Sequence, residues 1–133
     1  KARKWQVTSN NILFLFIINE IIGSHFGSKQ AVSTERAVQM MNHEEAVVFD
    51  VRTEAEFSAG HIVGAEQLAA VSLDKKMSHL QKYLKQPIII ATATGQDTAK
   101  VMTLLQAKGF LQIFVLSGGM QAWKSAGMPV IKS

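Results

Sequence analysis

The side chains best placed to do chemistry in this chain stand in one short stretch, residues 87–99, which reads PIIIATATGQDTA. The apolar run 87–91 predicts a buried strand, the polar residues 92–97 predict a loop, and a helix is predicted from Thr98. A loop that leads into a helix presents backbone N–H groups beside the positive end of the helix dipole. This arrangement favours the binding of an anion.

Thr92, at the end of that strand, is the first side chain to consider as a nucleophile. A threonine hydroxyl becomes a nucleophile when a base lies beside it. All histidines of the chain belong to other segments: His25, His43, His61 and His79. Thr92 is therefore expected to be a strand-end residue and not a nucleophile.

The chain contains no cysteine, which excludes disulfides, thiolate metal sites and persulfide carriers. No metal site and no cofactor are predicted, because a lone histidine in a turn, such as His61, is expected to make hydrogen bonds and not to hold a metal. A length of 133 residues predicts one domain. A hydrophobic content of 47% and a charged content of 18% are typical of a globular protein.

The net charge of +4 does not predict nucleic-acid binding. A nucleic-acid site needs aromatic side chains between its basic residues, so that bases can stack on them. Only Tyr83 lies among the lysines of the predicted helix 73–84, and these lysines are therefore expected to form a solvated face.

Strand and helix patterns alternate from residue 31 to residue 126. Strands are predicted at 31–32, 47–51, 67–68, 88–91 and 113–116, and helices at 34–41, 54–59, 73–84, 98–108 and 120–126. Runs that are apolar on both faces, such as VVFDV at 47–51, indicate a parallel sheet covered by helices. The prediction is an α/β domain with a mainly parallel five-stranded sheet and helices on both faces.

Several motifs together resemble the rhodanese-like domain. They are DVR at 50–52, GHIVGA at 60–65 and GGMQAW at 118–123, which flank the loop after the strand 88–91. The resemblance implies the rhodanese-like fold over most of the chain. It also implies that active members carry a nucleophilic cysteine at the position of Thr92. The loop equivalent to their active site is then Thr92, Ala93, Thr94, Gly95, Gln96, Asp97 and Thr98.

Asp97 departs from the family pattern in charge, since active members often have an anion-binding group near the end of this loop. A carboxylate is expected to cap the following helix. At about 5 Å and an effective dielectric constant of about 20, it would also repel a unit anion by about 3 kcal/mol. Gly95 is expected to adopt a left-handed or tight-turn conformation.

The residues expected to support the loop are structural. Asp50 is expected to accept hydrogen bonds from backbone N–H groups of neighbouring loops, Arg52 to pair with Glu56 at four-residue spacing, and His61 to hydrogen-bond within its turn. Trp123, in the GGMQAW motif, is expected to lie in the core.

The apolar segment ILFLFII at 12–18 follows a basic start, and this order resembles a signal peptide or a membrane anchor. It is too short to span a bilayer. Three interpretations stay open: a helix buried on this domain or on another copy, a helix in the membrane interface, or the stub of a longer anchor. The chain opens on Lys1 without methionine, so removal of an upstream segment is expected. Residues 1–27 are thus set apart from a domain at 28–133.

Two functions are predicted. The first is a catalytically silent rhodanese-like domain of a bacterial protein that acts as a binding or scaffold module. It would be cytoplasmic and held at the inner face of the membrane, at a protein partner or at a second copy through residues 12–26. The alternative is a sulfurtransferase-type enzyme for thiosulfate or persulfide sulfur, which takes its thiol from a partner. Thr92, Asp97 and the absence of cysteine favour the first function.

Overall fold

The structure, a computed structural model, describes residues 30–69 and 73–133. The predictions for residues 1–27, including the apolar segment 12–26, therefore lie outside the described residues. Among the described residues, no helix has the length and apolarity needed to cross a bilayer.

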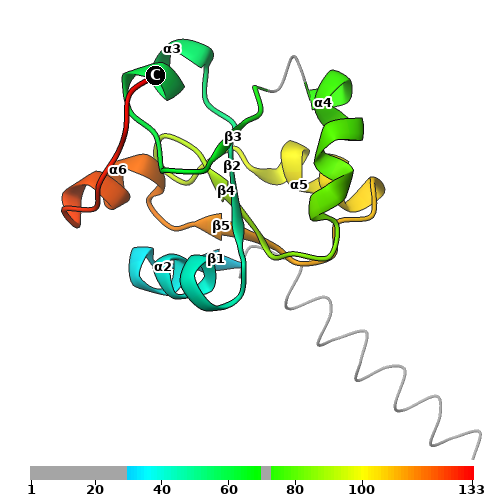
Figure 1. The fold of residues 1–133 in the computed structure, drawn as a ribbon, viewed down its shortest axis with the longest axis horizontal. Helices are drawn as coiled ribbons and strands as arrows, with labels where there is room; N and C mark the ends of the chain where they lie inside the picture. The colour runs from blue at the N-terminus through cyan, green and yellow to red at the C-terminus, as the bar shows by residue number, and fades with distance from the viewer. Residues whose placement is uncertain (1–29, 70–72) are drawn as a thin grey trace, which may run out of the picture. The chain divides into compact units, whose positions relative to one another are not determined.

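A five-stranded sheet with the order β1-β5-β4-β2-β3 forms the centre of the domain (Figure 1). Its strands are β1 (Ala31–Val32), β2 (Val47–Asp50), β3 (Glu66–Gln67), β4 (Ile88–Ala91) and β5 (Ile113–Leu116). Every pair of neighbouring strands is parallel. All four residues of the central strand β4 are buried, as expected for a strand that is covered on both faces. The predicted fold class is confirmed.

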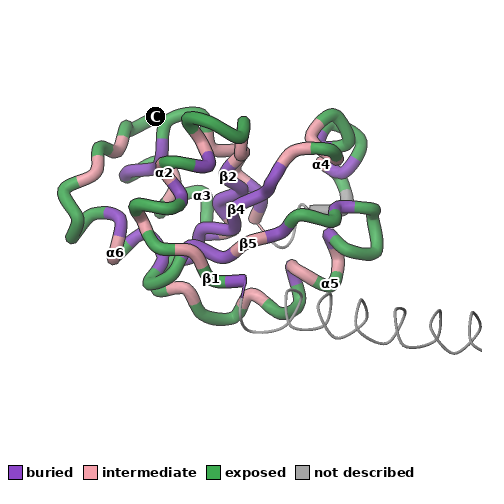
Figure 2. The backbone as a smooth tube through the Cα atoms, turned by 90° about the horizontal axis from the view of Figure 1, so that it is seen from below, coloured by how far each residue is buried: buried purple, intermediate pink, exposed green. Residues whose placement is uncertain are grey.

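Helices cover both faces of the sheet. On one face, α2 (Thr34–His43) and α6 (Gly119–Ser125) pack in a core with Ile89 and Leu116. On the other face, α4 (Leu73–Leu80) and α5 (Ala99–Ala107) pack in a second core with Phe49 and Ile90. Figure 2 shows these two pairs of helices on opposite sides of the strands.

Local signals explain most element boundaries. Ser33 caps α2 by accepting a hydrogen bond from the N–H of Arg36 at 3.0 Å. The short helix α3 (Glu54–Ala59) begins with a capping box between Thr53 and Glu56. The predicted helix 73–84 instead ends as α4 at Leu80 and continues as the 3-10 helix η2 (Gln81–Tyr83). The predicted strand 67–68 lies one residue earlier, as β3.

Trp123 anchors α6 in the core, as predicted. Its side chain is only 3% exposed. Its indole Nε1 donates a hydrogen bond to the carbonyl oxygen of Pro129 at 2.9 Å, which ties the chain after α6 back to the helix. The apolar ring therefore fills core volume while its polar atom stays satisfied.

Tyr83 fastens η2 to the edge strand β3. Its hydroxyl donates a hydrogen bond to Oε2 of Glu66 at 2.7 Å, and Nε2 of His79 lies 3.5 Å from Oε1 of the same carboxylate. The hydrogen bond to Glu66 raises the pKa of Tyr83 above its ordinary value of 10.0, and burial and the negative charge of Glu66 act in the same direction.

Replacement of Trp123 by alanine is expected to lower the free energy of unfolding by about 3–5 kcal/mol, because it deletes a large core aromatic ring. Urea unfolding measures this loss. Leu111→Ala is the control: Leu111 is 69% exposed, and its loss should change stability by about 0.5 kcal/mol at most. Similar losses in the two variants would contradict the core placement of Trp123.

The single tyrosine of the chain makes the Glu66 contact measurable. Phenolate absorbance of the folded chain should titrate with a midpoint above 10.0, and Glu66→Gln should move it down towards 10.0. Since the pKa is raised in the folded state, the contact should stabilise the fold below pH 10.0 and lose this effect as the pH rises through the folded-state pKa. Glu45→Gln, at an exposed turn, should leave the midpoint unchanged, and an equal shift there would refute the assignment.

Candidate functional site

The candidate site lies at the carboxyl edge of the sheet. Because the strands are parallel, the segments that follow β2, β4 and β5 emerge at this same edge. Arg52 follows β2, Thr92 follows β4, and the glycine pair Gly118 and Gly119 follows β5. Three motifs that are far apart in the sequence thus meet here.

The turn after β5 is packed tightly against the loop after β4. Gly119 has a φ of +59°, and a Cβ atom there would lie 2.7 Å from the carbonyl carbon of Ala93 and from the nitrogen of Gly95. Next to it, the N–H of Met120 donates to the carbonyl oxygen of Thr92 at 2.8 Å, and the N–H of Gln121 donates to that of Ala93 at 3.0 Å. The start of α6 therefore holds the loop in place.

Gly95 supplies the conformation that the loop needs. Its φ is +86°, as the sequence predicted, and a Cβ atom would lie 2.9 Å from the nitrogen of Gly118. Any other residue would combine backbone strain with a steric clash at this position. The loop and the glycine turn thus depend on each other.

Thr92 is nearly buried, with 9% exposure. Its hydroxyl oxygen accepts a hydrogen bond from the N–H of Gly95 at 2.6 Å, so the side chain occupies one of the loop's own donors. The N–H groups of Ala93, Thr94 and Gln96 make no hydrogen bond within the described part of the chain. Donors for a ligand are therefore present, but no nucleophile with an adjacent base accompanies them.

The prediction that Asp97 caps the following helix is wrong. The N-cap of α5 is Thr98, whose side chain makes no capping hydrogen bond. Asp97 instead has a φ of +60°, a left-handed conformation that aspartate and asparagine tolerate better than most residues. Asp97 therefore lies one residue before the N-cap of α5, and its side chain is exposed.

The prediction that Arg52 pairs with Glu56 is also wrong. The buried guanidinium of Arg52 donates from Nη2 to Oδ2 of Asp50 at 2.7 Å and to the carbonyl oxygen of Gly60 at 2.8 Å. Asp50 also accepts the backbone N–H of Arg52 at 3.1 Å. The carboxylate of Glu56 instead accepts a hydrogen bond from the hydroxyl of Thr53 at 2.9 Å. The positive charge of Arg52 is thus compensated within the fold.

A shallow hollow of about 290 Å³ lies beside the loop. It is lined by residues 51–53 and Glu56 on one side, and by residues 92–94, Gln96 and Asp97 on the other. The carboxylates of Glu56 and Asp97 give its exposed wall negative charge, while Arg52 is neutralised by Asp50. Thr53 and Glu56 were not among the predicted site residues. Their three-residue spacing is typical of a capping box, and this signal could have placed them at the helix start that follows Arg52.

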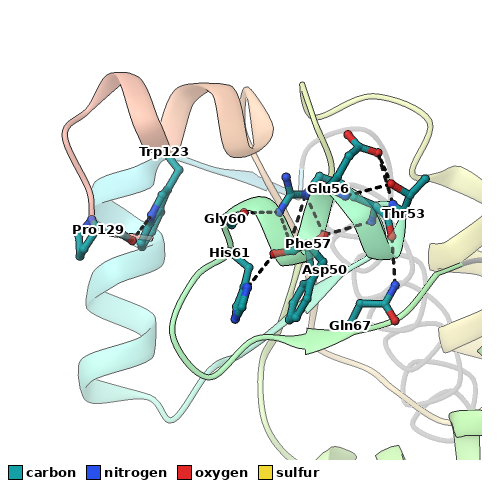
Figure 3. Close-up of polar contacts among 10 residues, drawn as sticks. Asp50, Thr53, Glu56, Phe57, Gly60, His61, Gln67, Trp123 and Pro129 are labelled. Carbon is teal, nitrogen blue, oxygen red and sulfur yellow. Dashed lines mark hydrogen bonds and ion pairs between the residues drawn. The ribbon is translucent and has the colours of Figure 1, made fainter. Parts of the chain in front are cut away.

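His61 lies apart from this hollow. Its Nδ1 donates to the carbonyl oxygen of Phe57 at 2.8 Å, and its ring stacks on the Phe57 ring at 3.7 Å (Figure 3). Its backbone pairs with Ile131 in an antiparallel bridge. His61 therefore joins α3 to the carboxyl-terminal tail. No group of three or more acidic or histidine side chains suited to a metal ion occurs in the described residues.

Comparisons with known proteins agree with this geometry. The model of the rhodanese-like domain matches residues 33–126. The uncharacterized protein YibN of Escherichia coli K12 is 28% identical over 104 residues, which cover 77% of this chain and 73% of YibN. The thiosulfate sulfurtransferase GlpE of Pseudoalteromonas translucida is 30% identical over 95 residues, which cover 71% of this chain and 89% of that protein.

Solved structures show the same fold. A rhodanese-like domain from Anabaena has a TM-score of 0.67 and 26% identity, and the match covers 78% of this chain and 80% of that one. A rhodanese-related protein from Thermoplasma volcanium has a TM-score of 0.64 and 25% identity, over 77% of this chain and 98% of that one. The matched family model and the fold agree: this chain belongs to the rhodanese-like domain family, and it is a member without a cysteine.

Proposed function

We propose that this chain is a catalytically silent rhodanese-like domain that works as a binding or scaffold module. The main support for the proposal is the identity of the residue that follows β4. Thr92 stands where the resemblance places the nucleophilic cysteine of active members, and its hydroxyl accepts the N–H of Gly95. A hydroxyl cannot carry a persulfide, and the rest of the chain offers no sulfhydryl group.

The charge around the hollow supports the same proposal. Thiosulfate and cyanide are anions, whereas Glu56 and Asp97 line the hollow with carboxylates. Arg52, the cation that lines the hollow, already pairs with Asp50 at 2.7 Å. An anionic substrate would therefore meet repulsion that the loop N–H groups offset only in part.

The alternative function is sulfur transfer with a thiol that a partner supplies. Two observations favour it: the free N–H groups of Ala93, Thr94 and Gln96, and the similarity to the thiosulfate sulfurtransferase GlpE. Under this alternative the hollow would receive the partner's sulfur, and activity would appear only when the thiol is added.

The partner and the place of action are proposed from the sequence alone. Residues 12–26 would bind a protein partner, a second copy or the inner face of the cytoplasmic membrane, with the basic start of the chain near anionic headgroups. A module held in this way would present its hollow to a ligand without transforming it.

The isolated chain is expected to show no thiosulfate:cyanide sulfurtransferase activity, because it has no sulfur nucleophile. The assay is run with and without a small added thiol, and the protein mass is measured after incubation with thiosulfate. Turnover above the buffer rate in the thiol-free arm, with a sulfur-loaded mass, would refute the silent module. Turnover above the protein-free, thiol-containing blank only when thiol is present would favour the alternative.

Thr92→Cys alone is expected to gain little activity, because Asp97 still opposes the anion. Thr92→Cys with Asp97→Asn should be about tenfold more active or better, since asparagine tolerates the left-handed conformation and removes the charge. Thr92→Cys with Glu35→Gln removes one exposed carboxylate on α2 and serves as the matched control. If the two double variants are equally active, the electrostatic explanation is wrong.

A further inference from the structure

Lysines gather in one of the two helical layers of the domain. The layer of α4, η2 and α5, with the turns that follow η2 and α5, carries six lysines: Lys75, Lys76, Lys82, Lys85, Lys100 and Lys108. Among these elements only α4 contributes a carboxylate by sequence, Asp74. In the opposite layer, α2 and its following turn carry Glu35, Glu44 and Glu45, Arg36 is paired with Glu44 at 2.7 Å, and α6 carries a single lysine, Lys124.

Exposed apolar surface accompanies the lysines around α5. Leu111, in the turn after α5, is 69% exposed. A second hollow, of about 520 Å³, runs along the outer side of α5 and is lined mainly by apolar atoms of Ala99, Thr103, Leu104 and Ala107, with Lys100 beside them. From residue 98 to residue 133 the sequence contains no aspartate and no glutamate.

The exposed leucine and two of the lysines belong to adjoining turns. The side-chain amide of Gln112 donates to the carbonyl oxygen of Lys85 at 3.3 Å, and Gly109 lies against the side chain of Leu84. The turn that carries Lys108 and Leu111 is therefore beside the turn that carries Lys85. Both turns precede strands, so they lie at the amino edge of the parallel sheet, opposite the edge with the candidate site.

We propose that α5 and the turn after it, with the adjoining lysines, form a surface that binds an anionic lipid bilayer. An apolar side chain among lysines matches the interface of such a bilayer, where the leucine enters the acyl boundary and the lysines face the headgroups. A nucleic acid fits less well, because Phe110, beside Leu111, is fully buried, and Tyr83 is already bound by Glu66 and covered by Lys82 at 5.1 Å. This inference does not depend on whether Thr92 is inactive.

The first test is charge reversal in the full chain. Lys100→Glu with Lys108→Glu is compared with Lys124→Glu and Lys132→Glu, which change the net charge equally but lie in α6 and in the carboxyl-terminal tail. Binding to vesicles of equimolar phosphatidylcholine and phosphatidylserine is measured by flotation at low and at high salt. The first pair should weaken binding about tenfold or more at low salt, and the control pair about threefold or less.

Equal weakening by the two pairs would show an effect of net charge alone and would overturn the proposal. So would tighter binding of a single-stranded RNA than of the vesicles with the same dependence on Lys100 and Lys108. Thermal unfolding of all variants checks that these exposed substitutions leave the fold intact.

The second test reports contact directly and uses the absence of cysteine. Leu111→Cys and Gln121→Cys, both at exposed positions, each accept a single environment-sensitive fluorophore on the full chain. The probe at residue 111 should shift its emission to shorter wavelength when the anionic vesicles are added, and the probe at residue 121 should not. A shift at residue 121 alone, at both positions equally or at neither would refute the surface, even if the chain binds the vesicles through another part.

Discussion

The backbone contact between Gly119 and the loop after β4 is the constraint on which the candidate site depends. The turn approaches the loop so closely that no Cβ atom fits at Gly119, and Gly95 meets the same limit from the other side. The first N–H groups of α6 donate to the carbonyl oxygens of Thr92 and Ala93. Those carbonyl groups are therefore held, and the loop N–H groups are left at the edge of the hollow.

Because backbone atoms make this contact, the shape of the loop does not require a particular side chain at residue 92. A threonine fits, and its hydroxyl is satisfied by Gly95 at 2.6 Å. Asp50 and Arg52 support the same edge through their buried ion pair and through the hydrogen bond of Arg52 to the carbonyl oxygen of Gly60. The loop therefore keeps its shape with a threonine at residue 92. What remains is a hollow with free donors and two carboxylates.

The hollow beside Thr92 and the exposed Leu111 lie at opposite edges of the sheet, and α5 runs from one edge to the other. The hollow beside Thr92 lies at the carboxyl ends of β2 and β4, whereas Leu111 lies just before β5. A strand of four residues separates the two edges by about 13 Å. A ligand in the hollow and a bilayer at the turn after α5 would therefore not compete for the same residues, which suits a module that presents one face while it is held by another.

The sequence by itself determined the α/β class, the five strands and the family, because these follow from local periodicity and from short motifs. It also determined that no cysteine chemistry is available, and it predicted a left-handed or tight-turn conformation for Gly95. Tertiary structure alone decided the partners of charged residues. Arg52 pairs with Asp50 and not with Glu56. A buried, bidentate ion pair at the end of β2 is more stabilising than an exposed ion pair at four-residue spacing. Asp97 does not cap α5, because the loop reaches the helix with residue 97 in the left-handed region and Thr98 at the N-cap. The gathering of lysines in one helical layer likewise appears only once the crossovers place α4 and α5 on the same side of the sheet.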